Sequence, residues 1–179
     1  MDRLAPTINL LASGANYAQV EGDNNGNTIT VHRESLNSNT VVVREGTTKV
    51  SFSNTAGYFT VDVFGRDGND DIQVVETNGS FDGYTPPGTN MYVPPITTRF
   101  PGEGGDDTLV GGSSKDFLAG RPGNDSNDGG AGYDSIHEEL YQESKSAASS
   151  IVLTNSQIAV TVGTVTKIAP ASNFEGVYL

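Results

Sequence analysis

Residues 102–137 repeat with a period of nine residues, and this period constrains the fold more than any other feature of the sequence. Written in rows, the segment reads GEGGDDTLV, GGSSKDFLA, GRPGNDSND and GGAGYDSIH. Every row opens with glycine and has aspartate at its sixth position. A short, fixed period of this kind is the signature of a repeat architecture, in which each unit packs on its neighbours.

Each row combines a turn with a short strand. Its first six residues are rich in glycine and polar residues, which suit tight turns. Its last three residues suit a strand whose eighth side chain points inward, and Leu109, Leu118 and Ile136 hold that position. Asn127 breaks the apolar pattern in the third row. Two rows complete one flattened coil, so we expect the first row to stack on the third and the second on the fourth.

This stacking places aspartates of different rows next to each other. Asp107 would lie over Asp125, and Asp116 over Asp134, at the spacing of about 4.8 Å between neighbouring strands. Two carboxylates at that distance repel each other by roughly 3–4 kcal/mol at an effective dielectric constant of about 20. Residues 101–143 hold 10 acidic and only 2 basic residues, so protein cations are scarce. A hard dication such as calcium, which takes 6–8 oxygen ligands, fits this arrangement best.

The rows resemble the RTX, or haemolysin-type, calcium-binding nonapeptide repeat, G-G-x-G-x-D-x-U-x. The resemblance implies an all-β fold with a short right-handed parallel β-roll, a β-solenoid, flanked by further strands. It also implies that calcium ions lie between successive turns, held by aspartates and by carbonyls of the glycine region. The metal-site residues that the resemblance implies are Asp107, Asp125, Asp116, Asp134, Gly102, Gly104, Gly105, Gly111, Gly120, Gly123, Gly129 and Gly132.

Two further rows lie upstream of the tandem array. Residues 65–73, GRDGNDDIQ, match the pattern, and Asp70 would add a metal site if it stacks on the array. Residues 22–30, GDNNGNTIT, have Asn27 in place of the aspartate, and we expect them to form a turn between strands. Within the array, residues 113–115 depart from the pattern, so we expect better turn geometry at Asp107 and Asp125 than at Asp116 and Asp134.

The rest of the chain is rich in β-branched and aromatic runs, which favour strands. Strands are predicted at residues 28–31, 40–43, 49–52, 58–63, 150–153, 158–162 and 164–168. A short helix is predicted at residues 137–148.

Four regions follow from this pattern. Residues 1–76 form either earlier coils of the same solenoid, which we favour, or a small sandwich. Residues 77–101 read as a proline- and glycine-rich loop, and residues 102–137 as the calcium-binding β-roll. Residues 138–179 hold strands that cap or continue the roll, and their end loosely resembles a type I secretion signal.

Composition excludes several classes of function. The chain has 22 acidic and 10 basic residues, a net charge of −12, which disfavours binding to nucleic acid or to anionic membranes. It lacks cysteine, which excludes disulfides and cysteine-type zinc sites. No apolar run is long enough for a membrane span. An acidic, glycine-rich stretch is often a flexible linker, but four copies in phase favour a calcium site.

Other motifs fail on their spacing. Asp125–Gly130 has the wrong offsets for an EF-hand loop, and Ile136 occupies the position of the final glutamate. The sequence from His137 begins like the HExxH motif of zinc proteases, but Tyr141 occupies the position of the second histidine. His137 is therefore expected at a strand end or on the surface. No nucleophile elbow, P-loop or dinucleotide fingerprint occurs.

These observations favour a non-catalytic, calcium-binding module of a secreted or cell-surface bacterial protein, whose export route stays open. Calcium would fold and rigidify the acidic segment, because an ion that binds only the folded state stabilises it. One alternative is an accessory β-roll of an extracellular hydrolase or epimerase. Another is an adhesin-like domain that binds a glycan or a protein through the strands of residues 7–63.

Overall fold

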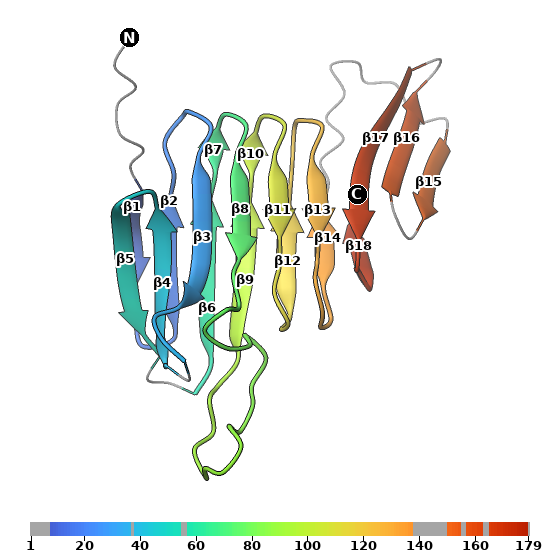
Figure 1. The fold of residues 1–179 in the computed structure, drawn as a ribbon. Helices are drawn as coiled ribbons and strands as arrows, with labels where there is room; N and C mark the ends of the chain where they lie inside the picture. The colour runs from blue at the N-terminus through green and yellow to red at the C-terminus, as the bar shows by residue number, and fades with distance from the viewer. Residues whose placement is uncertain are drawn as a thin grey trace.

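The computed structural model is all-β, as the sequence predicts (Figure 1). It describes residues 8–36, 38–54, 57–137, 150–154, 157–162 and 165–178. Within these residues there is no helix, and therefore none that could cross a bilayer. The strands form two large mixed sheets and one small two-stranded sheet.

One large sheet has seven strands. Their order is β1 (Asn9–Ser13), β2 (Tyr17–Glu21), β6 (Phe59–Phe64), β9 (Ile96–Pro101), β12 (Asp116–Ala119), β14 (Ser135–His137) and β18 (Gly176–Tyr178). All neighbours in this sheet are parallel except β1 and β2.

The other large sheet has nine strands. Their order is β15 (Ser150–Thr154), β16 (Gln157–Val162), β17 (Val165–Ser172), β13 (Ser126–Asp128), β11 (Thr108–Val110), β8 (Asp71–Val74), β3 (Thr28–Arg33), β4 (Thr40–Glu45) and β5 (Thr48–Ser53). The strands from β17 to β3 are parallel, and antiparallel strands extend the sheet at both ends.

The chain passes repeatedly from one sheet to the other. It runs from β2 to β3, from β6 to β8, and from β9 through β11, β12 and β13 to β14. Leu109 pairs with Asn127, and Leu118 pairs with Ile136, so the first row of the array stacks on the third and the second on the fourth. This is the stacking that the nine-residue period predicts.

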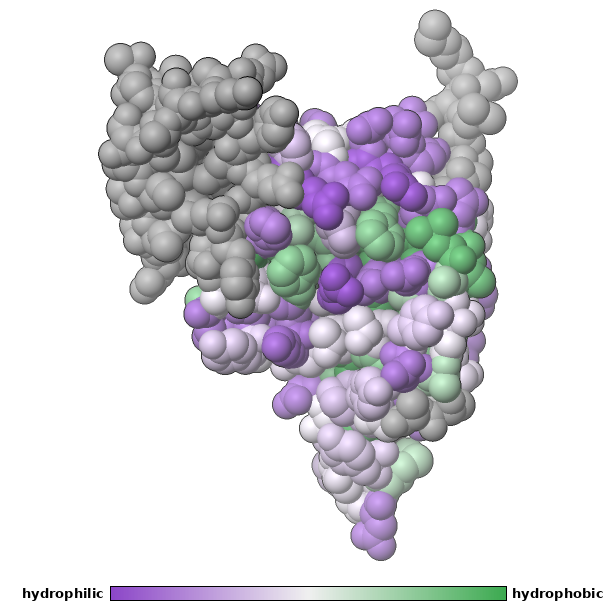
Figure 2. Space-filling model, turned by 180° about the vertical axis from the view of Figure 1, so that it is seen from behind, coloured by the Kyte–Doolittle hydropathy of each residue, from purple (hydrophilic) through white to green (hydrophobic). Residues whose placement is uncertain are grey.

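The hydrophobic core lies between the two sheets. Alternate side chains of the strands are fully buried there, among them Val61, Ile72, Phe100, Leu109 and Leu118. Figure 2 shows one outer face, on which hydrophobic side chains form small groups separated by hydrophilic ones. The period-two alternation of each strand therefore separates the core from the surface.

The predicted strands are confirmed in β3, β4, β5, β6, β15, β16 and β17. His137 ends β14, as expected, whereas the rest of the predicted helix lies outside the described residues. The loop predicted for residues 77–101 is wrong at its end, because residues 96–101 form β9. Ile96, Thr98 and Phe100 alternate inward and are fully buried, and the neighbouring prolines hide this strand pattern in the sequence.

A buried arginine anchors the long segment between β8 and β9, which projects from the lower end of the strands in Figure 1. The Arg33 guanidinium donates hydrogen bonds of 2.9 Å to the carbonyl oxygens of Ser80, Ser38 and Pro94. It also lies 5.7 Å from the centre of the Phe81 ring. A single side chain thus ties the two ends of this segment to the loop after β3.

We expect the substitution Arg33→Lys to destabilise the fold by about 2–4 kcal/mol, because an ammonium group cannot reach three separated carbonyls and leaves buried acceptors without donors. Chemical denaturation measures this loss. Arg44→Lys, at a partly exposed residue of β4, is the matched control, with an expected change of about 0.5 kcal/mol or less. Equal effects of the two substitutions would show that Arg33 is not an anchor.

Candidate metal centre

The turns between the two sheets stack in two columns, one on each side of the coil. The first turn column joins the seven-stranded sheet to the nine-stranded sheet and consists of residues 22–27, 65–70, 102–107 and 120–125. The second turn column joins the nine-stranded sheet back to the seven-stranded sheet and includes residues 111–116, 129–134 and 173–175. All the glycines and aspartates predicted as metal-site residues lie in these turns.

Aspartates at the sixth position connect neighbouring turns of the first turn column. The backbone N–H of Asp70 donates to Oδ1 of Asp107 at 2.9 Å, and the N–H of Asp107 donates to Oδ1 of Asp125 at the same distance. The N–H of Asn27 donates to Oδ1 of Asp70 at 2.7 Å. Asp70 therefore stacks on the array, and the upstream row is part of the same column.

The second turn column repeats this arrangement. The N–H of Asp116 donates to Oδ1 of Asp134 at 2.8 Å, and the N–H of Asp134 donates to Oε2 of Glu175 at 2.7 Å. Sequence analysis missed Glu175, because it belongs to no glycine-led row and only its acidic side chain marks it.

The second oxygen of several of these carboxylates is buried without a hydrogen-bond donor. Among the described residues, this holds for Oδ2 of Asp70, Asp107 and Asp134. These side chains are almost fully buried, as are those of Asp116 and Asp125. A buried carboxylate oxygen without a donor is costly and has to be compensated by a proton or a cation.

Asp116 differs from the other aspartates. Its Oδ2 accepts the N–H of Gly112 at 2.7 Å, and its Oδ1 accepts both the N–H and the hydroxyl of Thr98. The Asp116 carboxylate therefore accepts more hydrogen bonds from within the protein than the Asp107 carboxylate does.

Burial raises the pKa of these aspartates. Loss of solvation is the main cause, and it raises the pKa of Asp70 and Asp134 to about 7 and that of Asp107 and Asp116 to about 6. Neighbouring acids act in the same direction, such as Asp125 beside Asp107. The backbone hydrogen bonds oppose these shifts only in part. The columns thus attract positive charge at neutral pH.

Oxygens approach the first-position glycines too closely for a side chain to fit there. A Cβ on Gly65 would lie 2.3 Å from Oδ2 of Asp70 and 2.5 Å from the carbonyl oxygen of Gly102. A Cβ on Gly102 would lie 2.2 Å from Oδ2 of Asp107. Glycine at the first position therefore leaves room for the carboxylate oxygen of its own row and, at Gly65, for a carbonyl oxygen of the next turn. Oxygens of these two kinds are the ligands that calcium prefers.

Side chains alone do not complete a metal site within the described residues. No group of three or more histidine, cysteine, aspartate or glutamate side chains is placed there to hold an ion. Any cation in these columns therefore needs backbone carbonyls of the glycine-rich turns as well as the aspartates.

The metal-free protein should become more stable as the pH falls from about 8 to about 5. The folded-state pKa values of Asp70, Asp107 and Asp134 lie above the ordinary value of 3.8, so in this range the folded state binds protons that the unfolded state releases. This stabilisation is full below the unfolded pKa and is lost as the pH rises through the folded pKa. Urea midpoints after removal of divalent ions test this. A midpoint that falls on acidification contradicts the assignment.

Comparison with known proteins identifies the repeat. The family model of the RTX calcium-binding nonapeptide repeat matches residues 101–136 in four copies, one residue before the boundary read from the sequence. No curated protein and no solved structure matches the chain. RTX nonapeptide repeats bind Ca²⁺ and are generally non-catalytic. Residues 101–136 therefore carry the RTX calcium-binding nonapeptide repeat and indicate a calcium-binding module.

Proposed function

We propose that the chain is a non-catalytic module in which Ca²⁺ binds between stacked turns of a right-handed parallel β-roll, residues 102–137, and rigidifies it. The observation that carries this proposal is the set of buried Oδ2 atoms without donors at Asp70, Asp107 and Asp134. The parallel pairing of β11 with β13 and of β12 with β14 supports the roll.

The first turn column offers two positions for calcium, between Asp70 and Asp107 and between Asp107 and Asp125. Both are supported by the hydrogen bonds that connect these aspartates in pairs. The second turn column offers a position between Asp116 and Asp134. Because the protein already satisfies Asp116 with three hydrogen bonds, we propose that the first turn column binds calcium more tightly.

The roll is proposed to be one part of a longer solenoid. Residues 1–76 would supply earlier coils, supported by the parallel pairing of β2 with β6 and of β3 with β8. Residues 138–179 would continue it, supported by the pairing of β17 with β13 and of β18 with β14. This arrangement favours a continuous stack over a separate sandwich.

We propose, from the energetics of calcium binding, that the module works outside the cell. Extracellular calcium modules typically bind in the range of 10⁻⁴–10⁻³ M. At low calcium, the buried carboxylates repel one another, and this repulsion opposes the compact state. The net charge of −12 acts in the same direction. Millimolar calcium outside the cell would stabilise it, because the ion binds only the folded turns. The module would thus fold fully after secretion, whether in a cell-surface protein or beside a hydrolase or epimerase domain.

Calcium should increase the β signal in far-UV circular dichroism cooperatively, whereas magnesium should not, because Mg²⁺ demands stricter octahedral geometry and gives up its water reluctantly. A titration to about 10 mM of each ion covers the expected range of affinities. Absence of any response to calcium, in spectrum or in thermal stability, would refute the proposed function.

Asp107→Asn should weaken calcium binding by about 10-fold or more, because it removes one carboxylate from both positions of the first turn column. The amide oxygen can still accept the N–H of Asp70, so the metal-free fold should be unchanged or more stable. Isothermal titration calorimetry and urea denaturation measure these opposite effects. Asp82→Asn, at an exposed residue, is the control with the same change in charge. Equal calcium affinity of both variants would exclude Asp107 as a ligand.

A further inference from the structure

All four turns of the first turn column carry a charged residue at the second position, where the RTX pattern has glycine, and in three of them this residue has a positive φ. These three residues are Arg66, Glu103 and Arg121, with φ values of 82°, 76° and 68°. Residues with a Cβ are strained in this left-handed region, and glycine is not. The charged residues therefore occupy positions at which the backbone favours glycine. We expect an interaction of their side chains to compensate the backbone strain.

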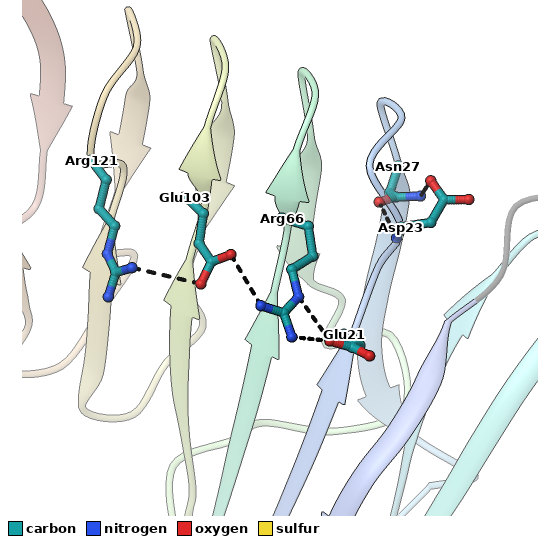
Figure 3. Close-up of polar contacts among 6 residues, drawn as sticks. All are labelled: Glu21, Asp23, Asn27, Arg66, Glu103 and Arg121. Carbon is teal, nitrogen blue, oxygen red and sulfur yellow. Dashed lines mark hydrogen bonds and ion pairs between the residues drawn. The ribbon is translucent and has the colours of Figure 1, made fainter.

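The compensating interactions are ion pairs that run from coil to coil (Figure 3). Nε of Arg66 donates to Oε2 of Glu21 at 2.7 Å, and its Nη2 contacts the same oxygen. Nη1 of Arg66 lies 3.5 Å from Oε2 of Glu103. Nη1 of Arg121 lies 3.6 Å from Oε1 of Glu103. Charges alternate along this line of Glu21, Arg66, Glu103 and Arg121, here named the charge ladder.

A second set of contacts connects the same turns through the fifth position. The N–H of Asp106 donates to Oδ1 of Asn69 at 3.0 Å, and the N–H of Asn124 donates to Oδ1 of Asp106 at 2.9 Å. Side chains at the second and fifth positions therefore both link successive turns, and neither set uses a metal.

The second turn column lacks such a ladder within the described residues. Its second positions are Gly112 and Gly130, which carry no side chain. The two columns can nevertheless be compared directly, because Asp107 and Asp116 occupy the same position. Both are buried, and both donate their N–H to the next aspartate, at 2.9 and 2.8 Å. Their surroundings differ in two ways: the charge ladder links the turns of Asp107, whereas Asp116 accepts hydrogen bonds from Thr98 and Gly112.

We propose that the residues of the charge ladder are positioning residues, which hold the turns of the first turn column in register before calcium binds. The calcium positions of this column are then preformed by contacts that do not involve the metal. This inference rests on the proposed calcium function. Its physical basis is that a site whose ligands are already in place loses less conformational freedom on binding.

Single exposed ion pairs contribute little, so the size of the effect has to come from the network. Glu103 pairs with arginines on both sides, and its side chain is only 25% exposed. Removing its charge breaks two pairs at once and leaves the strained backbone uncompensated. Glu103→Gln is therefore the most informative substitution, and Glu34→Gln, at an exposed residue outside the ladder, is its control for charge.

Amide hydrogen exchange by NMR in the metal-free protein tests the ladder without calcium. Glu103→Gln should speed exchange at Asp107 by about 3- to 10-fold, the equivalent of two exposed ion pairs, and about 1 M salt should do the same to the parent protein. Glu34→Gln should have no effect. Equal effects of the two variants on exchange at Asp107 would overturn the inference.

Calcium titration calorimetry then connects the ladder to binding. Glu103→Gln should weaken the tighter sites by about 3- to 10-fold, again the value of two ion pairs. Inversion of all four charges, E21R/R66E/E103R/R121E, keeps the net charge and the alternation and should restore affinity to within about twofold. A folded inversion variant that binds as weakly as Glu103→Gln would overturn the positioning role. If the parent protein binds no calcium, the proposed function fails, and the exchange experiment still decides on the ladder.

Discussion

Repulsion between buried carboxylates that the fold itself stacks on one another is the constraint on which the structure depends. Each aspartate uses Oδ1 to accept a backbone N–H from the preceding coil, as Asp107 does from Asp70 and Asp125 from Asp107. This hydrogen bond fixes the register of the turns. It also brings the like charges together, and burial raises the pKa of Asp107 to about 6. In Asp70, Asp107 and Asp134 one oxygen thus serves the fold, and the other needs a positive charge.

The N-terminal end of the first turn column shows how the chain limits the repulsion between stacked aspartates. Asn27 occupies the sixth position of the first turn and donates its N–H to Asp70, as the aspartates do to one another. Its side chain is an amide, so it adds no charge, and its Nδ2 donates to Glu45 at 2.9 Å. The row at residues 22–30 is therefore more than the turn that the sequence predicts, because its Asn27 ends the column of sixth-position aspartates.

The nine-residue spacing made the tandem array predictable from the sequence. The features that the sequence did not predict depend on pairing between residues far apart in the chain. A nine-residue period fixes which rows stack, and so the pairing of Asp107 with Asp125 could be read from the sequence. Asp70 could be assigned only conditionally, because β9 returns the chain to the stack after a long excursion. Glu175 lies 41 residues beyond Asp134 and outside any repeat, so no spacing pointed to their contact. The role of Arg33 also depends on partners far away in the sequence.

Protons and calcium compete for the same oxygens but have different effects on the turns. A proton on Asp107 or Asp134 removes one charge and relieves the repulsion within one column. A dication also takes carbonyl oxygens from neighbouring turns, so it links them as well as neutralising them. In the first turn column the alternating charges from Glu21 to Arg121 already provide such links. In the second turn column glycines stand at those positions, and Thr98 links the turns instead through its hydrogen bonds to Asp116. Calcium would therefore add mainly stability to turns that contacts within the protein already hold in register.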